Sequence, residues 1–164
     1  MKYLLKTLFF ALAVQCQATT IEGRVVGVAD GDTITVLDAS DTQHKIRLAG
    51  IDAPEKHQPF GQRSKESLSD LVFGRAVMVE TDKRDKYGRN VGKVLVDGND
   101  ANLEKVKRGL ACHYKQYEKE QPANDRVEYA VAEGAARASR LGLWADAEPV
   151  APWEFRHRTK AALQ

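Results

Sequence analysis

The chain has 164 residues, of which 43% are hydrophobic, and it carries 25 Lys and Arg against 23 Asp and Glu. This length fits one domain, and this apolar content is too high for a disordered chain. The near-balance of charge excludes a protein that attracts nucleic acid through its overall charge, so any such attraction has to come from local clusters. The four histidines lack zinc-ligand spacing, and no P-loop or dinucleotide fingerprint occurs.

The first 18 residues have the pattern of a secretory signal peptide. Lys2 and Lys6 flank the start of an apolar run at 4–14, and the small Ala18 suits cleavage after it. The run is too short for a membrane-spanning helix, so we expect an exported protein, periplasmic or secreted, with no stable membrane association. A first core helix or strand is the alternative interpretation of this segment.

Removal of residues 1–18 takes away two lysines and no acid, which leaves 23 basic against 23 acidic residues and a net charge of zero. Cys112 is then the only cysteine, which excludes an internal disulfide. Its apolar neighbours predict a buried, inert thiol. Lipid attachment at Cys16 is a further alternative to simple cleavage, although the bulky Gln15 disfavours it.

The remaining pattern predicts an α+β protein. Gly31 marks a tight turn between two alternating, Val-rich stretches, and Asp100 can cap a short helix. In chain order we expect strands at 21–28, 33–37, 43–51, 75–81 and 91–96, and helices at about 60–73, 101–110 and 124–141, the last with Val127 and Val131 on its packing face. Five strands with a helix after the third resemble an OB-fold β-barrel with about three packed helices.

Three short motifs supply carboxylates and arginines, namely Asp30-Gly31-Asp32-Thr33, Asp52-Ala53-Pro54-Glu55 and Lys86-Tyr87-Gly88-Arg89, and Arg47 lies between the first two. Carboxylate oxygens bind hard divalent cations, and a further carboxylate can activate water. Guanidinium groups can grip a phosphate and stabilise the charge of its transition state. Each motif alone is more simply a turn or a solvated surface segment. Together they fit metal-assisted hydrolysis of a phosphodiester.

Asp32 shares strand parity with Ile34 and Val36, so its carboxylate should point towards the apolar side of its strand. An unpaired carboxylate is costly there, and a bound cation would resolve that conflict. Asp30 fits the role of a turn residue. Pro54 favours an extended conformation for Ala53, which can direct the Ala53 carbonyl outwards.

The order and spacing of these motifs resemble the staphylococcal nuclease (thermonuclease) family, whose pattern is a DGDT turn, an arginine, a D-x-P-E turn and a YGR turn. The resemblance covers roughly residues 21–145 and implies the OB-fold barrel. With it we divide the chain into a signal peptide at 1–18, a nuclease domain at 19–146 and a C-terminal tail at 147–164.

The resemblance implies that Ca²⁺ is bound by Asp32, Asp52 and the backbone carbonyl of Ala53, and that Glu55 is the general base. It also implies that Arg47 holds the phosphate through two hydrogen bonds and that Arg89 aids departure of the leaving oxygen. The residues that it places near the bound nucleotide are Lys86, Tyr87 and either Tyr114 or Tyr117.

The function implied is that of a calcium-dependent phosphodiesterase, an endonuclease that cleaves DNA, RNA or both to 3′-phosphate ends and acts as a monomer. Segment 82–93, with five basic and two acidic residues, is the best local candidate for attraction to the phosphate backbone. One alternative is a noncatalytic nucleic-acid-binding OB-fold module, which would have lost carboxylates or arginines of the set. Another is an oligosaccharide- or protein-binding barrel, which would not need that set.

Overall fold

The computed structural model describes residues 19–162, so the predicted signal peptide lies outside the described residues. Within 19–162 no helix is both long and apolar enough to cross a membrane. The elements in chain order are β1 (Thr19–Val28), β2 (Thr33–Leu37), β3 (Gln43–Leu48), β4 (Ile51–Asp52), α1 (Gly61–Val72), β5 (Ala76–Arg84), β6 (Asn90–Val96), β7 (Asn99–Asp100), α2 (Ala101–Lys107), β8 (Cys112–His113), the 3-10 helix η1 (Lys115–Glu120), α3 (Ala123–Ala138), the 3-10 helix η2 (Gly142–Ala145) and α4 (Pro152–Ala162).

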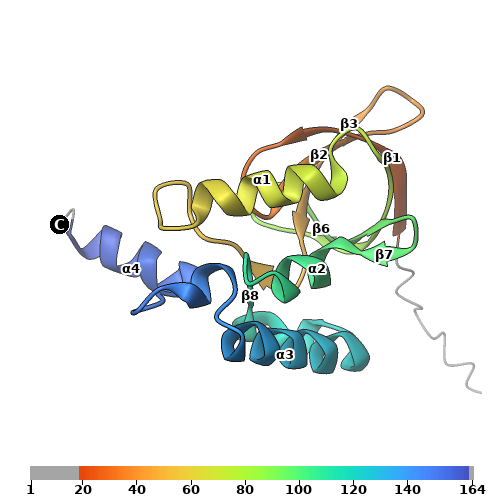
Figure 1. Ribbon diagram of the computed structural model, residues 1–164. Coiled ribbons are helices and arrows are strands. Elements are labelled where there is room, and N and C mark those ends of the chain that lie inside the picture. Colours follow the sequence, from red (N-terminus) through yellow and green to blue (C-terminus); the bar gives the residue numbers. More distant parts are fainter. Residues whose placement is uncertain (1–18, 163–164) are drawn as a thin grey trace, which may run out of the picture.

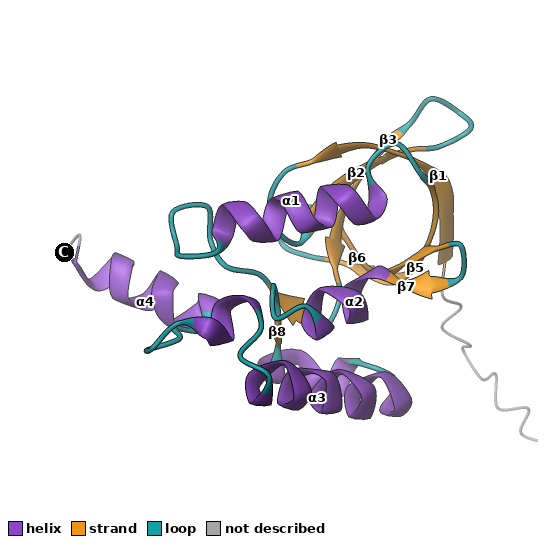
Figure 2. Ribbon diagram, viewed as in Figure 1, coloured by secondary structure: helices purple, strands orange, loops and turns teal. Residues whose placement is uncertain are grey.

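The main sheet closes on itself. Its strand order is β3-β2-β1-β5-β6-β7, and an additional parallel pairing of β3 with β6 joins β1, β2, β3, β5 and β6 into a barrel, which Figure 2 shows in orange. All the other pairings in the sheet are antiparallel. The predicted α+β barrel of OB-fold type is therefore confirmed.

The barrel core follows from the alternation of buried and more exposed residues along the strands. Ile34 and Val36 in β2 and Ile46 and Leu48 in β3 are buried, while the residues between them are more exposed. Side chains of α1, among them Leu68, complete this core, and α1 lies across the barrel (Figure 1). The core thereby fixes which residues at the strand ends face one another.

The predicted strand 43–51 is wrong at its end, because the chain bends after Leu48. Gly50 adopts a φ of +70°, a left-handed conformation that glycine tolerates best. The chain then pairs again as β4 with β8, with Ile51 opposite His113 and Asp52 opposite Cys112. This bend carries Asp52 away from the barrel wall and towards the β1–β2 turn.

The packing face predicted for the third helix is also wrong. Val127 and Val131 are 63% and 67% exposed, whereas Tyr129 and Ala136 on the opposite side are buried. The Tyr129 hydroxyl donates a 2.7 Å hydrogen bond to Asp100. Burial of a large aromatic ring with a satisfied hydroxyl outweighs burial of two valines, so the helix turns its tyrosine inwards.

Three further boundaries differ from the predictions. Strand β5 runs to Arg84, so the predicted charged loop shrinks to 85–89. Helix α2 ends at Lys107, before Gly109 at a φ of +64°, although Asp100 caps it as predicted by accepting from the Leu103 amide. The tail beyond 146, for which the pattern gave no structure, contains helix α4.

Candidate active site

The turn between β1 and β2 packs closely against α1 and the segment after β4. Asp30 accepts a 3.0 Å hydrogen bond from the Asp32 amide, as expected for a turn residue. A Cβ added to Gly31 would lie 2.2 Å from Ser64 Oγ and 2.6 Å from the Ala53 Cβ. Only glycine therefore allows this turn to approach both α1 and the segment after β4, and that approach leaves Asp32 only 7% exposed.

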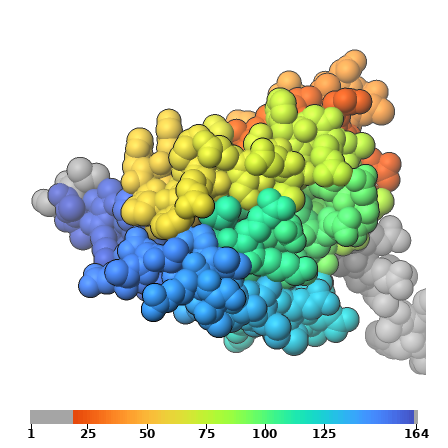
Figure 3. All heavy atoms as spheres, viewed as in Figure 1, coloured from red at the N-terminus to blue at the C-terminus, as the bar shows by residue number. Residues whose placement is uncertain are grey.

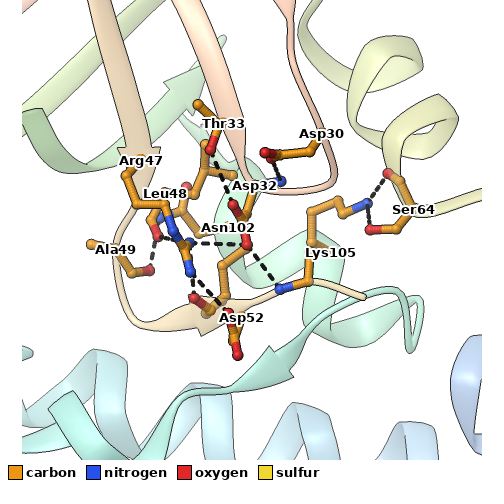
Figure 4. Close-up of polar contacts among 12 residues, drawn as sticks. Asp30, Asp32, Thr33, Arg47, Leu48, Ala49, Asp52, Ser64, Asn102 and Lys105 are labelled. Carbon is orange, nitrogen blue, oxygen red and sulfur yellow. Dashed lines mark hydrogen bonds and ion pairs between the residues drawn. The ribbon is translucent and has the colours of Figure 1, made fainter. Parts of the chain in front are cut away.

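Asp32 and Asp52 converge on the guanidinium of Arg47, as Figure 4 shows. Arg47 Nη1 lies 3.1 Å from Asp32 Oδ2, and Nη2 lies 3.1 Å from Asp52 Oδ1. Asp32 Oδ2 also accepts a 2.9 Å hydrogen bond from the amide of Ala53. The structure thus brings together all three residues of the predicted metal set.

The electrostatics of this pair favour a nearby positive charge. Burial raises the pKa of Asp52 above its ordinary value, and neighbouring Asp32 acts in the same direction, while Arg156 and Arg47 partly offset both effects. Burial and Asp32 likewise raise the pKa of Asp30. Two carboxylates buried this close together are stable in their charged form only beside cations.

The donor set fits a hard cation such as calcium. Among residues 19–162 no three His, Cys, Asp or Glu side chains lie close enough together to hold a metal ion. An ion at this site would therefore rest on Asp32, Asp52 and backbone oxygen such as the Ala53 carbonyl. These donors are all oxygen, the ligand type that calcium prefers, and so few of them leave coordination positions for water and phosphate.

Arg89 joins the site from the turn between β5 and β6. Asp85 shapes that turn by accepting from the amides of Tyr87 and Arg89, and its Oδ2 lies 2.7 Å from Arg89 Nε. Arg89 Nη1 donates to Thr33 Oγ1 over 3.2 Å, and that hydroxyl donates to Asp32 Oδ1 over 3.2 Å. One threonine hydroxyl therefore links the predicted catalytic arginine to the predicted metal ligand.

Glu55 lies at the rim of the site, where its side chain is 40% exposed. Gln58 fixes its backbone by accepting a 3.1 Å hydrogen bond from the Glu55 amide. An arginine that the sequence did not single out for the site, Arg156 of α4, lies 2.7 Å from Glu55 and 2.8 Å from Asp52. The sequence shows Arg156 only as a basic residue in the C-terminal tail, outside the family resemblance. Its spacing from the site motifs does not indicate that it reaches Asp52 and Glu55.

The predicted nucleotide-binding residues fall into two groups. Tyr87 is 71% exposed at the turn, with Lys86 Nζ 5.1 Å and Arg89 Cζ 5.5 Å from its ring centroid. Tyr114 lies beside the carboxylates, because its amide donates a 2.9 Å hydrogen bond to Gly50. Tyr117 is 44% exposed and contacts Tyr114 edge to face, with ring centroids 5.0 Å apart.

The predicted basic segment 82–93 is less positive than its composition indicates. Lys83 forms an ion pair with Glu120, and Lys93 forms one with Asp125 at 2.6 Å. Both acids come from later in the chain, where a local count of charge does not find them. Arg89 also pairs with Asp85 in the turn, so the positive charge that this segment offers to a phosphate comes mainly from Arg84 and Lys86, neither of which forms an ion pair among residues 19–162.

Two buried polar residues of α2 support the site (Figure 4). Asn102 donates to the carbonyls of Ala49 and Gly92 over 3.0 Å and 3.1 Å and accepts from the Val94 amide, which ties the bend after β3 to β6. Lys105 hydrogen-bonds the carbonyl and the hydroxyl of Ser64, and burial lowers the pKa of Lys105 to about 7. Sequence reasoning missed both, although they share the inward stripe of α2 with Val106.

Comparison with known proteins agrees with this geometry. Residues 45–146 match the family model described as Staphylococcal nuclease homologue. The chain belongs to the staphylococcal nuclease family. An "Uncharacterized endonuclease" of Haemophilus influenzae is 41% identical over 93% of this chain and 83% of the relative. Another "Uncharacterized endonuclease", from Escherichia coli O157:H7, is 43% identical over 96% of this chain and 98% of the relative. A "Micrococcal nuclease" of Shigella flexneri is 40% identical over 85% of this chain and 83% of the relative.

Proposed function

We propose that this protein is an exported, calcium-dependent endonuclease that hydrolyses DNA, RNA or both and leaves 3′-phosphate ends. Family membership and the names of its relatives support a nuclease. The observation that carries the proposal is the meeting of Asp32 and Asp52, from two separate elements, at the Arg47 guanidinium. Glu55 and Arg89 border the same site.

Each group has a role that suits its surroundings. Asp32, Asp52 and the Ala53 carbonyl would hold the ion, which when bound supplies positive charge to stabilise the phosphoryl oxygens. Glu55 takes a proton from the attacking water, because it is the solvent-facing carboxylate of the site. Arg89 donates a proton or a hydrogen bond to the leaving 5′ oxygen.

Arg47 is oriented before substrate arrives. Its Nη1 donates 3.0 Å hydrogen bonds to the carbonyls of Leu48 and Ile51 on either side of the bend. This anchoring removes most of the freedom of a long side chain, so little entropy is lost when the guanidinium grips a phosphate. Arg47 therefore combines two tasks, since it shapes the bend and presents positive charge to the reacting phosphate.

Export and substrate capture complete the proposal. The signal pattern of residues 1–18 supports a periplasmic or secreted enzyme. Because the chain without these residues has no net charge, attraction to nucleic acid depends on local groups such as Lys86 and Arg89 in the β5–β6 turn. The exposed Tyr87 beside them offers a stacking surface for a base.

The test is digestion of end-labelled single-stranded DNA and RNA by the purified protein, first with calcium and then with a chelator. We expect cleavage only with calcium, and products that carry 3′-phosphates. Asp52→Ala should lose calcium binding, whereas Asp97→Ala, which removes a 74% exposed side chain from a distant turn, should retain it. Binding of the oligonucleotide without cleavage in any metal would instead identify a noncatalytic module, and full cleavage in chelator would refute the metal site.

A further inference from the structure

Helix α4 places a positive charge on the predicted metal and base residues. Arg156 Nη2 lies 2.8 Å from Asp52 Oδ2, and its Nη1 lies 3.1 Å from Asp52 Oδ1 and 2.7 Å from Glu55 Oε1. With Arg47 also on Asp52 Oδ1, both oxygens of the Asp52 carboxylate are engaged by guanidinium groups. Arg156 therefore supplies the charge that the site would otherwise take from a metal ion.

The same face of α4 also covers the aromatic residue next to the site. The rings of Trp153 and Tyr114 are stacked, with centroids 5.5 Å apart and an angle of 11° between their planes. Trp153 and Arg156 are three positions apart, so they project from one side of the helix. Because a nucleic-acid base would bind Tyr114 by this kind of stacking, Trp153 occupies the surface that a base would use.

A third contact fixes the segment that leads into α4. Gln58 donates a 2.7 Å hydrogen bond to the Val150 carbonyl while its side-chain oxygen holds the Glu55 amide. Pro152, the first residue of α4, is buried. The C-terminal residues, blue in Figure 3, accordingly pack against the yellow segment that leads into α1. The contacts of α4 thus converge on the active site.

We propose that α4 is an autoinhibitory lid, in which Arg156 competes with the metal ion for Asp52 and Glu55 while Trp153 shields Tyr114. The guanidinium repels a divalent cation and occupies space at Asp52, and it also engages the carboxylate that would activate water. The Arg156 side chain is 41% exposed while its partner Asp52 is 2% exposed, so the guanidinium can move into solvent once a cation replaces it at the buried carboxylate. A divalent ion can therefore open the lid, and a polyanionic substrate favours the same open state. This inference rests on the proposed function.

Calcium affinity, measured by titration calorimetry, separates the lid from a passive tail. Arg156→Ala should bind calcium about tenfold more tightly, the gain expected when a closed state that holds about nine-tenths of the molecules is removed. Trp153→Ala leaves every charge in place and should change calcium affinity in the same direction. Arg158→Ala is the matched control, because this side chain of α4 is 68% exposed and, among residues 19–162, its ion pair is with Glu154 of its own helix.

Hydrogen exchange of residues 152–162 gives a second readout that is independent of activity. In the wild type these amides should be protected without calcium and exchange faster with it, whereas in Arg156→Ala they should exchange fast in both conditions. Equal calcium affinity in wild type, Arg156→Ala and Trp153→Ala would overturn the lid alone. Weaker binding of an oligonucleotide by Arg156→Ala at unchanged calcium affinity would make Arg156 a substrate ligand, which also overturns it. If no variant binds calcium, the proposed function fails and the lid fails with it.

Discussion

The ammonium group of Lys105 is buried between α1 and α2, and we therefore predict that it changes how the free energy of unfolding depends on pH. Burial lowers the pKa of Lys105 from 10.5 to about 7 in the folded protein. Between these two values the unfolded chain holds a proton that the folded chain has released, so the free energy of unfolding rises with pH. Between pH 6 and pH 9 this one group should contribute a rise of about 2–3 kcal/mol, and the rise should disappear in Lys105→Met.

The assay is urea unfolding of the wild type and of Lys105→Met at a series of pH values. The difference between their two curves of unfolding free energy against pH isolates the contribution of Lys105 from all other titrating groups. Met has a similar length, and Ser64 Oγ retains its 2.6 Å hydrogen bond to the Leu110 carbonyl. Lys107→Met, which changes an exposed lysine of the same helix, should leave the pH dependence as in the wild type. If the curves of wild type and Lys105→Met run parallel from pH 6 to pH 9, the reasoning about burial is wrong.

Three further substitutions, with Gly134→Ala as a control, test the framework of the site. Asn102→Ala should lower the free energy of unfolding by about 1–3 kcal/mol in chemical denaturation, because the Val94 amide and the Ala49 carbonyl lose their Asn102 partner, while the Gly92 carbonyl keeps its hydrogen bond from the Ala49 amide. Gly31→Ala should lower the free energy of unfolding by about 1–3 kcal/mol, because the added Cβ overlaps Ser64 and Ala53. Gly134→Ala, whose added Cβ meets no atom within 4 Å, should raise it by about 0.5–1 kcal/mol. Equal effects of the two substitutions would contradict the packing of the turn. Arg47→Lys should lower kcat/KM about 10–100-fold, because lysine loses the two-pronged match to carboxylate and phosphate oxygens, and an unchanged value would place Arg47 outside the site.

The barrel could be predicted from the sequence because its signals are local. Alternation along β2 and β3 and the Gly31 turn are set by neighbouring residues, and the Asp100 cap acts within one helical turn. The packing face of α3 could not be predicted in this way, because both sides of that helix carry apolar residues. The choice between them depends on where Tyr129 meets Asp100, a partner 29 positions away.

The residues of the site likewise fall into those that local sequence patterns indicate and those that depend on contacts between distant elements. Asp32, Arg47 and Asp52 lie in motifs whose order and spacing were informative, and the structure brings these residues together. Arg156 and Lys105 depend instead on contacts between distant elements. Arg156 reaches Asp52 across 104 positions, and Lys105 reaches Ser64 across 41. No local pattern distinguishes Arg156 from a solvated surface residue, and the inward stripe of α2 places Lys105 without revealing its partner, so only the packed structure reveals these contacts.

The central claim is that Glu55 activates water at a calcium-loaded site. Its most direct test is the cleavage rate of a labelled single-stranded oligonucleotide by Glu55→Gln at saturating calcium, with Glu66→Gln, an exposed change on α1, as the control. We expect a rate lower by about 10²–10⁴-fold for Glu55→Gln, with calcium binding retained, and no loss for the control. A Glu55→Gln protein that is correctly folded and cleaves at the wild-type rate would contradict the account.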